Sequence, residues 1–225
     1  MSQTAAFFDV GGTLIQTYVW NGLMAYFQAV GKRRLTYFAF WAYHSPLYIL
    51  HKLGLMSQDS VRTLWAANLS WFFRGYSLEE AQAIWDWIVL DYLADAWRAD
   101  ARNALVQHKA DGHVVMLVSA GPLPLIERIA VEVGADYVVA TSHEVKDGKY
   151  TGRVEGEVCI GANKPKFAKA KLEEIGLTVD YAASYAYGDS PGDRVLFDIV
   201  GNPVAVHPDE LLLPIAMKEK WQILQ

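Results

Sequence analysis

The sequence predicts an α/β protein with a parallel sheet and an inserted helical region. The first observation is a series of short apolar runs that alternate with segments of helical periodicity, the pattern of a parallel sheet with crossover helices. These runs are residues 5–9, 114–119, 137–140, 184–189 and 203–206. The second observation is a shift in composition, because seven of the eight tryptophans fall between residues 20 and 97. A helical region therefore interrupts the alternation after its first run.

Two helices of this region have recognisable starts and apolar faces. Ser77 with Glu80 three residues later forms a capping box, and the helix that follows carries one apolar face. That face comprises Ala81, Ile84, Trp85, Ile88 and Tyr92. A second helix is predicted to begin at Ser57, and its apolar face comprises Val61, Leu64, Trp65, Leu69 and Phe72.

These patterns divide the chain into two predicted domains. Residues 1–16 and 99–225 form the α/β core, and residues 17–98 form the helical domain. Residues 143–155 read as a β-hairpin that turns at Asp147 and Gly148, outside the main alternation.

Composition and charge limit the kinds of partner. The chain has 225 residues, 52% of them apolar, which suits a packed globular protein. Its net charge of −5 and pI near 5.7, without a run of basic residues, exclude nucleic acid as an expected partner. Cys159 is the single cysteine and is expected to be a packed thiol, and the first residues lack the pattern of a signal peptide. We therefore expect a cytoplasmic protein; its oligomeric state is not encoded in any readable pattern.

Residues 35–55 are rich in apolar and aromatic side chains. His44, Ser45 and Pro46 interrupt them well short of the ~20 apolar residues that a membrane span needs, so no transmembrane helix is predicted. The basic sequence at residues 31–34 beside this aromatic stripe leaves open a peripheral contact with a membrane surface. We favour the alternative, in which the helical domain buries its own aromatic side chains.

The candidate site lies where the predicted strands end, because ligands of an open parallel sheet bind beyond the carboxyl ends of its strands. Asp9 closes the first apolar run. Gly11, Gly12 and Thr13 follow it, and such small residues let backbone amides approach an anion closely.

Three further segments supply polar groups at the same edge. Ser119 closes the second run and is followed by Ala120, shortly before a predicted helix start. Asp189 closes the fourth run, with Asp193 four residues later near the start of the next helix. Lys164 precedes another predicted helix and could neutralise a phosphate.

Together these segments resemble the haloacid dehalogenase (HAD) superfamily, specifically its phosphoserine phosphatase-like subfamily IB. The resemblance covers nearly the whole chain and rests on the stretches FFDVGGTL, VVMLVSAG, GANKPKF and YGDSPGD, in this order. It implies a Rossmann-like core with a helical cap inserted after the first motif. It also implies phosphatase chemistry in which Asp9 takes the phosphoryl group as an aspartyl-phosphate.

The resemblance also implies roles for the other site residues. Lys164 would offset the negative charge of the phosphate, whose oxygens would be held by Gly12, Thr13, Ser119 and Ala120. Mg²⁺ would be bound by Asp9, the backbone carbonyl of Gly11 and Asp189, and Asp193 would orient the metal shell. Oxygen ligands without histidine or cysteine favour Mg²⁺ over Zn²⁺.

Position 11 departs from the family pattern. Phosphatases of the superfamily carry there an aspartate that protonates the leaving group and activates water, and Gly11 can do neither. The missing acid–base help is typically worth ~10²–10⁴ in rate. Four explanations stay open: an engineered or accidental substitution, a natural enzyme for good leaving groups, a phosphoryl-binding protein, or different chemistry. Dehalogenation is disfavoured, because dehalogenases do not use the metal that Asp189 and Asp193 are placed to hold.

The aromatic-rich helical domain argues against a small, very polar substrate. Its arginines, Arg33, Arg34, Arg62 and Arg74, could each bind a substrate anion or simply be solvated. We predict a Mg²⁺-dependent phosphomonoester hydrolase for a small or lipid-like substrate, weakened by Gly11. The alternative is a catalytically impaired phospho-ligand or membrane-surface binding protein of the same fold.

Overall fold

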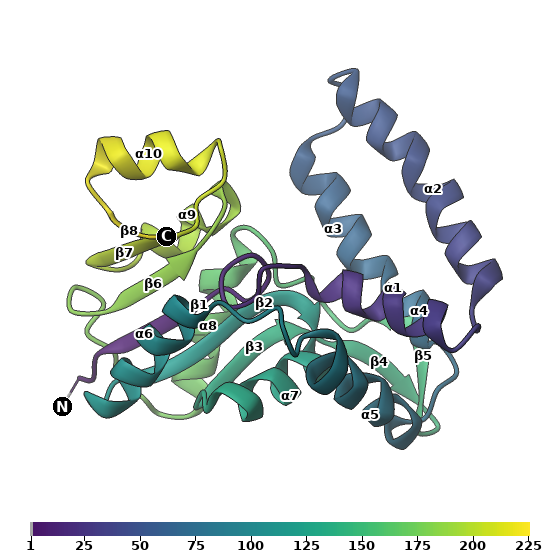
Figure 1. The fold of residues 1–225 in the computed structure, drawn as a ribbon, viewed down its shortest axis with the longest axis horizontal. Helices are drawn as coiled ribbons and strands as arrows, with labels where there is room; N and C mark the ends of the chain where they lie inside the picture. Colours follow the sequence, from purple (N-terminus) through teal and green to yellow (C-terminus); the bar gives the residue numbers. More distant parts are fainter. Residues whose placement is uncertain (1) are drawn as a thin grey trace.

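A six-stranded parallel sheet forms the centre of the protein. The computed structural model describes residues 2–225, without the side chains of residues 58 and 59. The strand order is β3-β2-β1-β6-β7-β8, and every neighbouring pair is parallel (Figure 1). The strands are β1 (Ala5–Phe8), β2 (Val114–Pro122), β3 (Tyr137–Thr141), β6 (Tyr185–Gly188), β7 (Asn202–Val206) and β8 (Gln222–Leu224). The predicted α/β fold class is therefore confirmed.

Helices cover both faces of the sheet, as a buried parallel sheet requires. Alternate residues of β1 point to opposite faces, so Ala6 and Phe8 join one apolar cluster while Ala5 and Phe7 join another. The first cluster includes residues of α6 (Ala99–Ala110) and α7 (Leu123–Val133). The second includes residues of α8 (Asn163–Glu174), α9 (Arg194–Phe197) and α10 (Leu212–Glu219).

Two elements of the structure, β8 and a π-helical turn, were not predicted. β8 was not predicted, because three residues are too short to register as a strand pattern. The helix that begins after Ser77 was expected to run on through Tyr92, but α5 (Leu78–Trp87) gives way to a π-helical turn, η1 (Ile88–Tyr92). The predicted capping box of Ser77 and Glu80 is present at the start of α5. The predicted hairpin is also present and consists of β4 (His143–Lys146) and β5 (Lys149–Val154).

The chain between β1 and α6 is helical. It contains α1 (Val19–Ala29), α2 (Arg34–Lys52), α3 (Gln58–Asn68), α4 (Ser70–Phe73), α5 and η1. α3 begins after Ser57, whose hydroxyl accepts a hydrogen bond from the Ser60 amide, as predicted. α2 and α3 pack side by side and project away from the sheet (Figure 1).

α2 is the exception to the expected burial of aromatic side chains. The helix continues through Pro46, and of its residues only Phe40 and His44 are buried. Phe38 is 73% exposed and Trp41 is 38% exposed. The predicted burial of aromatic side chains therefore holds for Phe40 and is wrong for most of the other aromatic side chains of this helix. Within residues 2–225, no helix combines the length and apolar character needed to cross a bilayer.

Candidate functional site

The site forms where the direction of strand order reverses. β1 lies between β2 and β6. The strand after β2, β3, lies toward one edge of the sheet, whereas the strand after β6, β7, lies toward the other edge. A crevice opens at such a switch point. Asp9 directly follows β1, and Asp189 directly follows β6. Ser119 lies in the last part of β2, which continues past the predicted end to Pro122 with a register irregularity after Val118. The sheet thus brings three predicted site residues to one edge.

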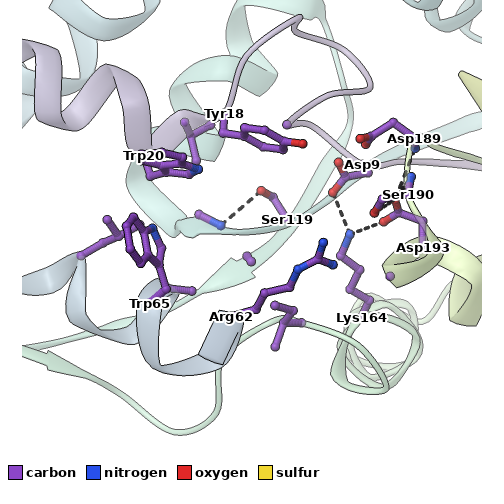
Figure 2. A pocket seen from close by; sticks show the side chains of 18 of the residues that line it. Asp9, Tyr18, Trp20, Arg62, Trp65, Ser119, Lys164, Asp189, Ser190 and Asp193 are labelled. Carbon is purple, nitrogen blue, oxygen red and sulfur yellow. Dashed lines mark hydrogen bonds and ion pairs between the residues drawn. The ribbon is translucent and has the colours of Figure 1, made fainter. Parts of the chain in front are cut away.

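Lys164 connects two of the carboxylates. Its Nζ lies 2.7 Å from Asp9 Oδ1 and 2.5 Å from Asp193 Oδ1, and all three side chains are buried (Figure 2). Burial alone would lower the pKa of Lys164, but the two carboxylates raise it instead, so the ammonium stays charged. The sequence suggested that Lys164 precedes a helix, but Lys164 lies in the first turn of α8.

Asp193 has its acceptor positions occupied by the protein. Its Oδ2 accepts hydrogen bonds from the Asp189 amide at 3.3 Å, the Ser190 amide at 3.2 Å and the Ser190 hydroxyl at 3.1 Å. Its other oxygen binds Lys164. The Asp193 carboxylate therefore holds the backbone that carries Asp189. These contacts suit a residue that orients Asp189 better than one that binds a metal ion directly.

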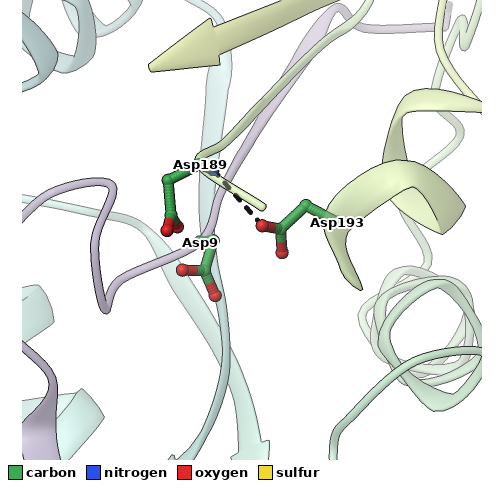
Figure 3. Close-up of side chains that lie close together, drawn as sticks. All are labelled: Asp9, Asp189 and Asp193. Atoms are coloured by element: carbon green, nitrogen blue, oxygen red, sulfur yellow. Dashed lines mark hydrogen bonds between the residues drawn. The ribbon is translucent and has the colours of Figure 1, made fainter. Parts of the chain in front are cut away.

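The three aspartates form a candidate metal centre. Asp9, Asp189 and Asp193 each offer a carboxylate oxygen, and these oxygens lie within 4.8 Å of one another (Figure 3). One ammonium faces three buried carboxylates, so the cluster carries an excess of negative charge. A hard divalent cation with oxygen ligands fits this donor set and this charge.

The pKa values reflect the crowding of negative charge. Burial raises the pKa of Asp9 to about 6, against the opposing effect of Lys164. Burial, followed by the charges of Asp9 and Asp193, raises the pKa of Asp189 to about 8. A cation bound between them would favour the ionised forms of both carboxyl groups.

The loop after Asp9 is held against the same cluster. Gly12 has φ +89°, and a Cβ atom there would lie 2.3 Å from Asp189 Oδ2. Arg98 Nε donates a hydrogen bond to the Gly12 carbonyl at 2.9 Å, and Thr13 Oγ1 donates to Asp189 Oδ1 at 3.0 Å. Gly12 and Thr13 do not line the cavity above the cluster, and their predicted contacts with substrate stay predictions.

A cavity of about 440 Å³ opens above these groups. Of the predicted site residues, the cavity is lined by Asp9, Gly11, Ser119, Ala120, Lys164, Asp189 and Asp193. Its other wall comes from the helical region and includes Tyr18, Trp20, Arg62 and Trp65 (Figure 2). The sequence did not single out Tyr18 or Trp20, and it offered Arg62 only as one of four equivalent arginines.

Other reactive side chains lie outside this cavity. Burial raises the pKa of the Cys159 thiol to about 12, which agrees with the predicted packed thiol. No histidine lines the cavity in the part of the chain that the structure describes. The ionisable and polar side chains that line the cavity are therefore carboxylates, the Lys164 ammonium, the Arg62 guanidinium and hydroxyl groups.

Substitution of Gly12 by alanine tests whether this loop needs a glycine. We expect Gly12→Ala to lower the free energy of unfolding by about 2–4 kcal/mol, because the new Cβ is both strained and in collision with Asp189. Gly156 is a matched control: its φ is +74°, but a Cβ there meets nothing within 4 Å. Gly156→Ala should cost about 1 kcal/mol from strain alone. Equal losses in denaturant unfolding would contradict the close contact with Asp189.

Comparison with known proteins agrees with this geometry. Residues 6–198 match the family described as haloacid dehalogenase-like hydrolase. The chain is 30% identical over 221 residues to phosphoserine phosphatase SerB1 of Mycobacterium tuberculosis, covering 97% of this chain and 70% of that protein. It is 27% identical over 222 residues to histidinol-phosphatase of Neisseria meningitidis, covering 97% of each.

A solved structure is also similar over the full length. It is a protein of unknown function from Bordetella pertussis Tohama I, with a TM-score of 0.84, 25% identity, and coverage of 100% of this chain and 99% of that one. The sheet order, the strand-end aspartates and these similarities agree on one assignment. The chain belongs to the haloacid dehalogenase-like hydrolases, among their phosphoserine phosphatase-like phosphatases.

Proposed function

We propose that the protein is a Mg²⁺-dependent phosphatase that hydrolyses a small phosphomonoester through an aspartyl-phosphate on Asp9. The observation that carries the proposal is the position of Asp9, which lies at the cavity floor, bound to Lys164 and beside Asp189. A carboxylate in this position faces a ligand in the cavity, and the neighbouring ammonium reduces its repulsion from a phosphate dianion.

In the proposed reaction, Asp9 attacks phosphorus while the bond from phosphorus to the leaving oxygen breaks. Water then attacks phosphorus while the bond from the Asp9 oxygen to phosphorus breaks, which gives inorganic phosphate, the free Asp9 carboxylate and a proton that passes to solvent. Ser119, which lines the cavity, would donate its hydroxyl to a phosphate oxygen, and Lys164 would balance the added charge. Thr13 fixes the orientation of Asp189 through its hydroxyl.

Mg²⁺ would be held by Asp9, Asp189 and the backbone carbonyl of Gly11, with Asp193 orienting Asp189. The bound ion would supply positive charge that offsets the phosphate and the clustered carboxylates. Gly11 is not among the residues with positive φ, so a left-handed backbone is not the reason for a glycine there.

The pH dependence of metal binding follows from the raised pKa values. Because burial and the neighbouring carboxylates raise the pKa of Asp189 to about 8, Mg²⁺ would compete with a proton for this carboxyl group, so the affinity should increase between about pH 5 and pH 8. The same shift means that the metal-free protein loses stability as pH rises through this range. We expect the increase in Tm caused by Mg²⁺ to be larger at pH 8 than at pH 5.5. An equal increase at both pH values, or one that persists in Asp189→Asn, would contradict this assignment.

The two walls of the cavity support the predicted domain division. Residues 1–16 and 99–225 supply the charged floor, and residues 17–98 supply Tyr18, Trp20, Arg62 and Trp65. We infer that residues 17–98 act as a cap that selects the leaving group. The buried single thiol, Cys159, is compatible with the reducing conditions of a cytoplasmic protein.

The substrate class follows from the cap wall. The cavity volume lies in the range of small-molecule sites, and its wall combines two indole rings with one guanidinium. This combination favours a phosphomonoester whose leaving group carries an apolar or aromatic part and an anionic group. Arg62 is the only one of the four cap arginines named above that lines this cavity.

Asn in place of Asp9 tests the nucleophile. A carboxamide has nearly the same shape but is a poor nucleophile, so Asp9→Asn should not form a hydroxylamine-sensitive phosphoprotein from a phosphate donor. Asp198→Asn is a matched control, because Asp198 is exposed and its nearest cationic group, Arg194 Nε, lies 3.7 Å away. A normal yield of phosphoprotein from Asp9→Asn would refute the assignment. Failure of the wild type to turn over any phosphomonoester with Mg²⁺ would favour the alternative, a phospho-ligand binding protein.

A second candidate activity is contact of α2 with an anionic membrane surface. Residues 10–58 contain no Asp or Glu but include Lys32, Arg33, Arg34 and Lys52, which lie at the two ends of α2. Exposed apolar residues, including Leu35 and Phe38, lie between these basic ends. This arrangement matches an interfacial helix.

Sedimentation with lipid vesicles tests this contact. We expect the protein to sediment with vesicles that contain phosphatidylserine and to be released as salt rises, because salt screens the basic groups. Leu35→Ser and Phe38→Ser should weaken binding, whereas Leu211→Ser, at an exposed residue outside α2, should not. Equal recovery in the supernatant with and without vesicles would remove this candidate.

A further inference from the structure

The space beside Gly11 is filled by a side chain from the cap. A Cβ atom built on Gly11 would lie 3.0 Å from Tyr18 Cδ1 and 3.7 Å from the Thr17 carbonyl oxygen. The Tyr18 ring therefore borders the place into which a side chain at position 11 would project. This is also the place where the family pattern has a carboxyl group and this chain has none.

Tyr18 is held in this place by its surroundings. It precedes α1, its carbonyl accepts a hydrogen bond from the Asn21 amide at 2.9 Å, and its ring stacks on Trp20 with the centroids 6.3 Å apart. The residue lines the cavity, and its hydroxyl end is directed toward Asp9 and Asp189 (Figure 2). No hydrogen bond from this hydroxyl is present among the side chains described by the structure. It is therefore available to a ligand.

We propose that Tyr18 is the general acid that protonates the leaving oxygen, in place of the carboxyl group absent at Gly11. This inference rests on the proposed phosphatase function. As the bond from Asp9 to phosphorus forms, the bond from phosphorus to the leaving oxygen breaks and its electron pair stays on that oxygen. The oxygen takes the phenolic proton of Tyr18, the alcohol departs, and the phenolate regains a proton from solvent.

Tyr18 should affect formation of the aspartyl-phosphate and its hydrolysis differently. A phenol is neutral near pH 7, so it can donate a proton to an alkoxide but is not a base for the attacking water. Tyr18 therefore assists formation of the aspartyl-phosphate and not its hydrolysis. The parameter that reports the first step is kcat/KM, because it covers all events up to departure of the alcohol.

The test compares two phosphomonoesters that differ in leaving group. Benzyl phosphate releases an alkoxide that needs a proton, whereas p-nitrophenyl phosphate releases a stable phenolate. Tyr18→Phe keeps the ring against Gly11 and Trp20 and removes only the hydroxyl. We expect kcat/KM to fall by ~10²-fold or more for benzyl phosphate and by less than about threefold for p-nitrophenyl phosphate. Trp20→Phe changes the same wall without removing an acid, so it should change kcat/KM for both substrates by a similar factor.

A rescue experiment separates loss of the acid from loss of the Tyr18 side-chain volume. Tyr18→Ala makes room beside position 11, so adding Gly11→Asp should restore at least ~10-fold of the benzyl phosphate activity lost in Tyr18→Ala. Equal losses on both substrates in Tyr18→Phe, or no loss on either, would overturn the role of Tyr18 while leaving the phosphatase proposal intact. If the wild type transfers phosphate to Asp9 from neither ester, the proposed function and this inference fail together.

Discussion

The structure of the site depends on a buried excess of negative charge. Lys164 places one ammonium between Asp9 and Asp193, and Asp189 lies beside them without a second cation from the described chain. Separating buried charges from water is costly unless they are paired, and here the pairing is incomplete. The raised pKa values of Asp9 and Asp189 are the direct result. This imbalance of charge is the pattern that would favour a divalent cation at these carboxylates.

The backbone of the site is constrained because aspartate side chains pack directly against glycines. Gly12 must lack a side chain because the Asp189 carboxylate occupies the space where its Cβ would be, and Gly188 is similarly close to the Cβ of Asp193. Hydrogen bonds from the Asp189 and Ser190 amides keep Asp193 in position, and Arg98 anchors the Gly12 carbonyl from the far side. Such supporting contacts hold charged groups in one geometry before any ligand arrives. Gly12 therefore serves close packing against the Asp189 carboxylate as much as approach to an anion.

The sequence was sufficient to place three residues of the site at one edge, because Asp9, Ser119 and Asp189 each close an apolar run that is typical of a buried strand. Asp9 and Asp189 end such runs, and the order of the runs brought them to one edge. The cap wall could not be placed in the same way. Tyr18 and Arg62 reach the cavity only through the way α1 and α3 pack on the core, which local periodicity does not encode. Periodicity also failed for α2, because an apolar stripe looks the same whether it faces a core or lies exposed.

The position of Tyr18 is nevertheless tied to the core by packing. Its neighbour Val19 is buried, and a Cβ on Gly121, near the end of β2, would lie only 2.8 Å from Val19 Cγ2. Leu23 on the next turn of α1 belongs to the same apolar cluster as Phe8 and Leu117, which are residues of β1 and β2. The start of α1 is thus fixed on the strands that carry Asp9 and Ser119. A half-exposed tyrosine anchored in this way has a defined position relative to Asp9, the proposed nucleophile. Proton transfer in a transition state requires such a defined position.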